Sequence, residues 1–136
     1  MNSTGVHLFV YGTLRRGSTS PMAALLDAQS QRIGTAQARG SLYALHGYPG
    51  FLPDGGEDWV IGDLFSILPE QAEPVLSALD DYEECSPAFP QPHEYRRAMV
   101  EVNIQGEILD AWTYVYAWPT TGLTRIKSGD WLAWSS

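Results

Sequence analysis

Acidic side chains near the end of a predicted helix are the residues of this sequence best suited to proton transfer. Four of the five residues 80–84 are Asp or Glu. At the carboxyl end of a helix, both the helix dipole and the neighbouring like charges disfavour ionised acids. If packing of Leu79 and Tyr82 directs Glu83 inward, its pKa rises and it can accept and return a proton near neutral pH. The segment is therefore either a general acid/base site at Glu83 or a solvated acidic patch, as most charge runs are.

A turn after the first predicted strand is the second candidate for a functional site, because it could bind an anionic group. Residues 6–11 are mostly apolar, so both faces of the strand are predicted to be largely covered, and the strand breaks at Gly12 and Gly17. Gly12 permits a positive φ or a close approach of the backbone to a ligand. The amides of Thr13 and Leu14 would then be free to donate hydrogen bonds to an anionic group. The alternative is an ordinary turn after an edge strand.

The other reactive side chains do not form a set with a recognisable chemistry. His7, His46 and His93 are far apart in the sequence and lack the Cys/His spacing of a metal site. Cys85 has no evident activating partner, so it is predicted to be an inert or surface thiol. We therefore expect no metal site.

Periodicity predicts the elements that position these residues. Gly34 and Gly40 predict bends or a bulge within a strand, and Pro74 predicts that the second helix is split. Along residues 109–118, small apolar side chains alternate with Trp and Tyr, as a narrow barrel covered by helices requires. The pattern therefore favours an α+β barrel. Strands are expected over residues 6–11, 33–45, 59–68, 95–104 and 109–118, helices over 21–28 and 69–82, and loops over 46–56 and 86–93.

Composition limits the class of protein. The 136 residues suffice for one domain, predicted to span residues 1–136, and 44% of them are hydrophobic. A net charge of −8 argues against nucleic-acid binding. No apolar run approaches the length of a membrane span, and residues 1–5 lack the features of an export signal. The one cysteine excludes an internal disulfide and fits a reducing compartment, so a cytoplasmic location is expected. The oligomeric state is left open.

Several blocks together carry a family resemblance. They are residues 9–17 (FVYGTLRRG), 40–50 (GSLYALHGYPG), 60–65 (VIGDLF), 79–83 (LDDYE), 95–97 (YRR), 112–116 (WTYVY) and 128–131 (SGDW). In order and spacing they resemble the γ-glutamylcyclotransferase-like superfamily, and most closely its γ-glutamylamine cyclotransferase and AIG2-like branch. The resemblance covers nearly the whole chain. It implies a small mixed β-barrel flanked by short helices.

The resemblance also implies a site. Glu83 would be the acid/base, Tyr11, Gly12, Thr13 and Leu14 would seat the glutamyl portion of the substrate, Gly50 would line the mouth, and Tyr95 and Arg97 would match the family's Tyr-x-Arg. That pair would shape the pocket or steady the acidic segment, and Arg97 could pair with an inward carboxylate or with Asp80. Family members commonly carry a glycine after the glutamate, where this chain has Glu84. That second carboxylate either raises the pKa of Glu83 or points to solvent.

The implied reaction is an intramolecular acyl transfer. The α-amine of a γ-glutamyl group attacks its own γ-carbonyl, closes 5-oxoproline and expels an amine or amino acid. The protein then needs no nucleophile and no cofactor, and the small-molecule γ-glutamyl substrate is its expected partner. The loop amides would bind either the α-carboxylate or the developing oxyanion. Two alternatives stay open: a non-catalytic small-ligand binding module with the same pocket, and a tailoring enzyme that removes γ-glutamyl from a carrier-bound intermediate.

Overall fold

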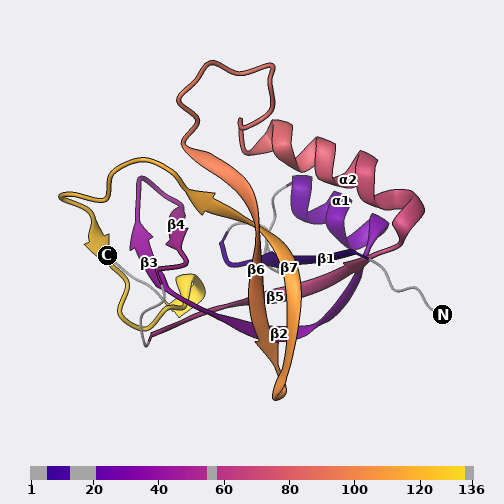
Figure 1. Ribbon diagram of the computed structural model, residues 1–136, viewed down its shortest axis with the longest axis horizontal. Helices are drawn as coiled ribbons and strands as arrows, with labels where there is room; N and C mark the ends of the chain where they lie inside the picture. The colour runs from indigo at the N-terminus through magenta and orange to yellow at the C-terminus, as the bar shows by residue number, and fades with distance from the viewer. Residues whose placement is uncertain (1–5, 13–20, 55–57, 134–136) are drawn as a thin grey trace.

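The computed structural model describes residues 6–12, 21–54 and 58–133 (Figure 1). The helices are α1 (Pro21–Gln29), α2 (Pro69–Tyr82) and a short 3₁₀ helix, Trp131–Ala133. Among the described residues, no helix has both the length and the apolar composition needed to span a membrane. The strands are β1 (Val6–Val10), β2 (Gln31–Arg39), β3 (Ser41–Ala44), β4 (Pro49–Leu52), β5 (Trp59–Ile67), β6 (Tyr95–Ile104), β7 (Glu107–Tyr116) and β8 (Thr124–Arg125).

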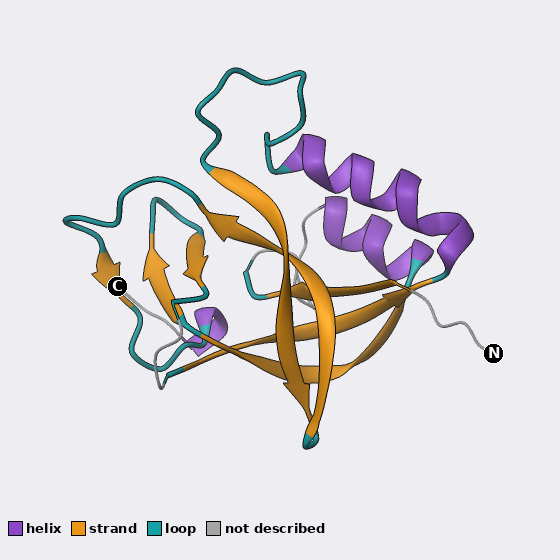
Figure 2. Ribbon diagram, in the orientation of Figure 1, coloured by secondary structure: helices purple, strands orange, loops and turns teal. Residues whose placement is uncertain are grey.

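Five strands close into a barrel in the order β1-β5-β2-β6-β7. Neighbours are antiparallel, except that β1 lies parallel to β7 and closes the barrel through the pair Leu8–Trp112. β4 also runs parallel to β7, and β3 and β8 continue the sheet beyond it. The two α-helices lie next to each other beside β1 (Figure 2). The predicted α+β fold, a small mixed β-barrel flanked by short helices, is confirmed.

Alternation along the strands produces two apolar clusters, one inside the barrel and one under the helices. In β1, Leu8 and Val10 belong to the cluster under the helices, whereas Phe9 packs inside the barrel. Leu26 of α1 and Leu79 of α2 are fully buried in the first cluster. Burying a side chain of this size stabilises the fold by about 1.5–3 kcal/mol. Because β1 is covered on both faces, as predicted, a shift of one residue in its register would misplace both clusters.

Helix α2 runs without interruption from Pro69 to Tyr82, so the prediction that Pro74 splits it was wrong. Pro74 is exposed to solvent within this helix. Because proline has no N–H, the helix lacks one backbone hydrogen bond in its first half. The buried residues Val75, Leu76 and Leu79 hold the helix against the barrel, and this burial outweighs the lost bond.

The glycines around β2 and β3 bend the sheet as predicted, but the following segment is not only a loop. The β2–β5 ladder shifts register between Arg32 and Gly34, and the chain turns at Gly40, whose φ is +149°. Within the predicted loop 46–56, residues 49–52 form β4. The ladder from β3 and the parallel pairing of Phe51 with Val115 supply backbone partners that local sequence does not reveal.

Candidate active site

A cavity of about 690 Å³ opens at one end of the barrel. It lies between the end of β1, the β3–β4 turn, the carboxyl end of α2 and the loop that leads from α2 into β6. Figure 2 shows that loop rising beyond the end of α2. The lining residues are 9–12, 47–49, 82–84, 89–95, 113, 114 and 118. The structure therefore brings the Tyr11–Gly12 turn and Glu83 to the same cavity.

The end of α2 determines where Glu83 points. Glu83 is the C-cap, and its N–H donates to the Leu79 carbonyl at 2.8 Å. The N–H groups of Glu84 and Cys85 then donate to the carbonyls of Asp81 (3.0 Å) and Asp80 (2.9 Å). This pair of bonds is a Schellman motif, which requires a left-handed residue after the C-cap, and Glu84 adopts φ +59° there. The glycine that the sequence resemblance implies after Glu83 would suit this left-handed backbone, which this chain forms with a glutamate.

Glu83 is a partly buried carboxyl group with an unusual proton affinity. Burial, and secondly the charge of Glu94, raise the pKa of Glu83 from its ordinary value of 4.5 to about 7. Within the described parts of the chain, no hydrogen bond to its ionised form offsets this effect. The adjacent Glu84 is not among the causes and is exposed to solvent. A group of this kind can both accept and donate a proton near neutral pH.

Glu94 is the site residue that the sequence reasoning missed. It is half-buried, lines the cavity and directly precedes β6. The Tyr48 hydroxyl donates to its two carboxylate oxygens at 3.0 and 3.2 Å, and the N–H of Ala117 donates to its carbonyl at 2.7 Å. Burial and this hydrogen bond raise the pKa of Tyr48 to about 12, so its hydroxyl remains a donor. The available sequence signal was an acid immediately before the predicted strand 95–104.

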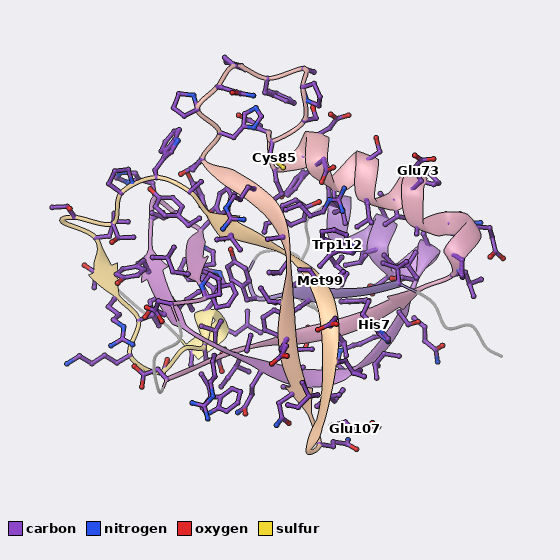
Figure 3. All side chains as sticks on the ribbon, in the orientation of Figure 1. His7, Glu73, Cys85, Met99, Glu107 and Trp112 are labelled. Atoms are coloured by element: carbon purple, nitrogen blue, oxygen red, sulfur yellow. The ribbon has the colours of Figure 1, made fainter. Side chains whose placement is uncertain are left out.

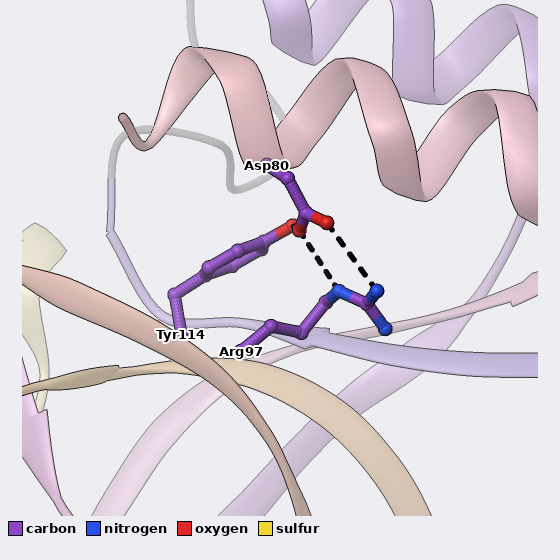
Figure 4. Close-up of polar contacts among 3 residues, drawn as sticks. All are labelled: Asp80, Arg97 and Tyr114. Atoms are coloured by element: carbon purple, nitrogen blue, oxygen red, sulfur yellow. Dashed lines mark hydrogen bonds and ion pairs between the residues drawn. The ribbon is translucent and has the colours of Figure 1, made fainter. Parts of the chain in front are cut away.

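Asp80 anchors the end of α2 to the barrel (Figure 4). Arg97 of β6 donates to Asp80 from Nε (2.8 Å) and Nη2 (3.3 Å), and the Tyr114 hydroxyl of β7 donates at 2.7 Å. Arg97 and Tyr114 are cross-strand partners, and the Arg97 guanidinium also lies 4.5 Å from the centre of the Trp112 ring. Of the two partners considered for Arg97, the structure shows Asp80. Arg97 does not line the cavity and acts on the helix that carries Glu83.

The turn after β1 is built around Tyr11 and Gly12. The buried Tyr11 hydroxyl donates to the Tyr114 carbonyl at 2.5 Å and accepts from the N–H of Phe51 at 3.3 Å, which joins β1 to β7 and β4. A Cβ on Gly12 would lie 2.7 Å from Cγ of Pro49, so this position requires glycine because a side chain approaches closely. Thr13 and Leu14 lie outside the described residues.

Of the remaining predicted site residues, Tyr95 lines the cavity and Gly50 does not. Tyr95 lines the cavity, and its hydroxyl donates to the Pro49 carbonyl at 2.6 Å. Gly50 is buried in β4 against Tyr116, whose Cγ would lie 2.9 Å from an added Cβ, and it does not line the cavity. Gly50 therefore permits packing between β4 and β7 and does not form the predicted mouth of the site.

Hydrogen bonds within the loop 86–93, and one from Trp118 to this loop, hold the rim of the cavity. Phe89 donates its N–H to the Ser86 carbonyl at 3.1 Å, and its own carbonyl contacts His93 Nε2 at 3.1 Å. Trp118 donates its indole N–H to the Pro92 carbonyl at 3.3 Å. Figure 3 labels Cys85 where this loop leaves α2; burial raises the pKa of its thiol to about 11, which leaves it protonated and poorly nucleophilic. Across the described residues, no three His, Cys, Asp or Glu side chains converge as metal ligands.

Known proteins resemble this chain along most of its length. It matches the family described as "Gamma-glutamyl cyclotransferase, AIG2-like" over residues 8–133. The gamma-glutamylcyclotransferase family protein ytfP of Citrobacter rodentium is 34% identical over 129 residues, 93% of this chain and 96% of that protein. The solution structure of ytfP from Escherichia coli has a TM-score of 0.62 at 30% identity and covers 94% of this chain and 97% of its own. The gamma-L-glutamyl-butirosin B gamma-glutamyl cyclotransferase of Niallia circulans is 31% identical over 114 residues, 81% of this chain and 66% of that protein.

Proposed function

Because the chain belongs to the AIG2-like gamma-glutamyl cyclotransferase family, we propose that it releases 5-oxoproline and a free amine or amino acid from a γ-glutamyl compound, with Glu83 as the general acid/base. The observation that carries this proposal is the Glu83 carboxyl group, partly buried in the cavity and with a pKa of about 7. An ordinary carboxyl group is too weak a base to take a proton from an ammonium group, whereas one with a raised pKa makes that transfer less uphill.

The proposed reaction balances without an added reactant. The α-ammonium of the γ-glutamyl group gives a proton to Glu83, and the free amine attacks the γ-carbonyl carbon to form the ring C–N bond. Glu83 gives this proton to the amide nitrogen, and the amide C–N bond breaks. Glu83, ionised again, takes the second surplus proton from the ring nitrogen and passes it to the departing amine. The products are the lactam and an ammonium ion, and Glu83 returns to its starting state.

The cavity would accelerate this reaction chiefly by restricting the substrate. A free glutamyl chain rotates about several single bonds, and holding its amine against its own carbonyl removes much of the entropic barrier. Hydrogen bonds to the Tyr114 carbonyl of β7 and the Pro49 carbonyl of β4 fix the hydroxyls of Tyr11 and Tyr95, which line the cavity. Thr13 and Leu14 are proposed to contribute amides for the α-carboxylate or the oxyanion.

A panel of γ-glutamyl amino acids and amines, with detection of 5-oxoproline, tests the proposal. We expect Glu83→Gln to lower kcat by about 10²–10⁴-fold, the usual contribution of general acid–base catalysis, while substrate binding measured by calorimetry is retained. Asp81→Asn is the matched control, because this exposed carboxylate lies two residues away on the same helix end. Wild-type turnover by the Glu83 variant would refute the assignment. Binding of the panel without any 5-oxoproline would instead indicate a binding module.

A further inference from the structure

We propose that Pro49 is a positioning residue, which holds the Tyr11–Gly12 stretch against the glutamyl portion of the substrate, and that the Tyr95 hydroxyl acts on this stretch through Pro49. The inference rests on the proposed function and adds a residue to its binding machinery. It follows from the way in which the end of β1 is held in the cavity wall.

The Tyr11–Gly12 stretch lies beyond the backbone ladders of β1. Among the described strands, the ladder with β5 ends at the pair Val10–Asp63, and the pairing with β7 ends earlier, at Leu8. β4 is paired with β3 and β7 and not with β1. Side-chain contacts must therefore fix the position of this stretch in the cavity wall.

Pro49 is a buried residue of β4 that lines the cavity and meets Gly12. A Cβ on Gly12 would lie 2.7 Å from Cγ and 2.9 Å from Cδ of Pro49, so the proline ring already packs against the Gly12 backbone. The ring cannot rotate away, because it is closed on its own backbone nitrogen. The φ of Gly12 lies outside the left-handed region. The proline ring, and not the backbone conformation, therefore excludes a side chain at position 12.

Pro49 is itself held from two sides. Its carbonyl accepts the Tyr95 hydroxyl of β6 at 2.6 Å, and its backbone pairs with Ala44 of β3. Further along β4, the N–H of Phe51 donates to the Tyr11 hydroxyl at 3.3 Å. β4 thus contacts both residues of the stretch, Gly12 through a ring and Tyr11 through a hydrogen bond. Neither contact involves Glu83, so Pro49 affects the placement of the substrate and not the proton affinity of the acid.

Steric complementation between positions 12 and 49 tests the inference. Gly12→Ala introduces the clash and should lower kcat/KM by about 100-fold, the scale of a misplacement of about 1 Å. Pro49→Ala removes Cγ and Cδ, the two atoms that the new Cβ would meet. The double variant should therefore recover to within about threefold of Pro49→Ala alone.

Pro49→Ala alone keeps the test decisive if Gly12→Ala does not fold. Without the ring, the stretch must be ordered when substrate binds, so KM should rise by about 10-fold, the scale of ordering one residue. The pH midpoint of kcat should stay unchanged, because Glu83 is not contacted. Pro53→Ala, the same substitution at an exposed position just after β4, should leave KM at the wild-type value.

Two further variants separate this contact from a general loss of packing. Gly50→Ala is the matched control for the rescue: its Cβ would lie 2.9 Å from Cγ of Tyr116, so Pro49→Ala leaves that clash in place and should not restore activity. Tyr95→Phe removes the hydrogen bond to the Pro49 carbonyl. It should raise KM more in the wild type than in Pro49→Ala, because the hydroxyl acts through the ring.

Two substrates show which part of the ligand Pro49 positions. γ-Glutamylalanine and γ-glutamylbutylamine share the glutamyl portion and differ in the leaving group, so Pro49→Ala should change KM for both by the same factor. A double variant no more active than Gly12→Ala, a KM change confined to one substrate, or a shifted pH midpoint in Pro49→Ala would overturn the inference and leave the proposed function intact. Release of 5-oxoproline from neither substrate, nor from the wider panel, would overturn both.

Discussion

Replacing Glu83 by Gln should stabilise the folded protein above pH 7 while it removes activity. The folded state raises the pKa of Glu83 from 4.5 to about 7, so between these values the native protein binds the proton more tightly than the unfolded chain does. The resulting stability is fully present below pH 4.5 and is lost as the pH rises through 7. Glutamine resembles the protonated acid at every pH, so the variant does not incur this loss.

The magnitude follows from the two pKa values. Their difference corresponds to about 3.4 kcal/mol at 1.36 kcal/mol per pKa unit, and partial solvent access to Glu83 reduces the expected value to about 2–3 kcal/mol. At about 2.1 cal/mol/K per residue, 136 residues unfold with an entropy of about 0.29 kcal/mol/K, so this free energy equals about 7–10 °C in Tm. The gain should be close to zero at pH 4 and complete at pH 8.

Thermal or urea unfolding of both proteins between pH 4 and 8 measures this difference. The other titratable groups are common to the two proteins, so the difference isolates position 83. A variant gain that is the same at every pH would show that the side chain gains from packing or hydrogen bonding and not from loss of a buried charge. A gain that is absent at pH 8 would mean that Glu83 ionises with an ordinary pKa, and the acid/base argument would lose its basis.

Two further substitutions test the end of α2. Glu84→Gly should raise the free energy of unfolding by about 1 kcal/mol, or about 3–4 °C in Tm, because the φ of residue 84 is +59°. Glu84→Ala keeps the Cβ and should not raise the free energy of unfolding. An equal gain in Glu84→Ala would show that the effect comes from loss of the charge. Asp80→Asn should lower kcat about 10-fold with little change in KM, because the helix end that carries Glu83 loses its ion pair with Arg97. A change in KM alone would contradict the role of Asp80 in positioning Glu83.

The sequence predicted the elements that obey local periodicity. The alternation of residues 109–118 predicts small side chains inside the barrel and large ones outside it, and the structure agrees at Ala111 and Tyr114. The acids at 80–84 and the turn at Gly12 were both identified as site candidates, and both line or support one cavity. These features succeed because each depends on neighbours within a few residues.

What local sequence could not supply was long-range pairing. Residues 49–52 form β4 because β3 and β7 offer hydrogen-bond partners, whereas their Gly- and Pro-rich local sequence predicts a loop. Pro74 lies in an intact helix because buried neighbours compensate for its missing bond. Local sequence does not predict a role for Glu94, because its hydrogen-bond partner, Tyr48, is 46 residues away in the sequence.

The hydrogen bonds between the end of β1 and β7 link formation of the cavity to the late stages of folding. The Thr113 hydroxyl donates to the Phe9 carbonyl, and Tyr11 donates to the Tyr114 carbonyl, across sequence separations of 104 and 103 residues. Contacts of such high contact order form slowly and late. A nascent chain that has not yet released β7 can form α2, which carries Glu83, but it lacks Thr113 and Tyr114, which line the cavity and hold the end of β1. The cavity is therefore complete only after the barrel closes.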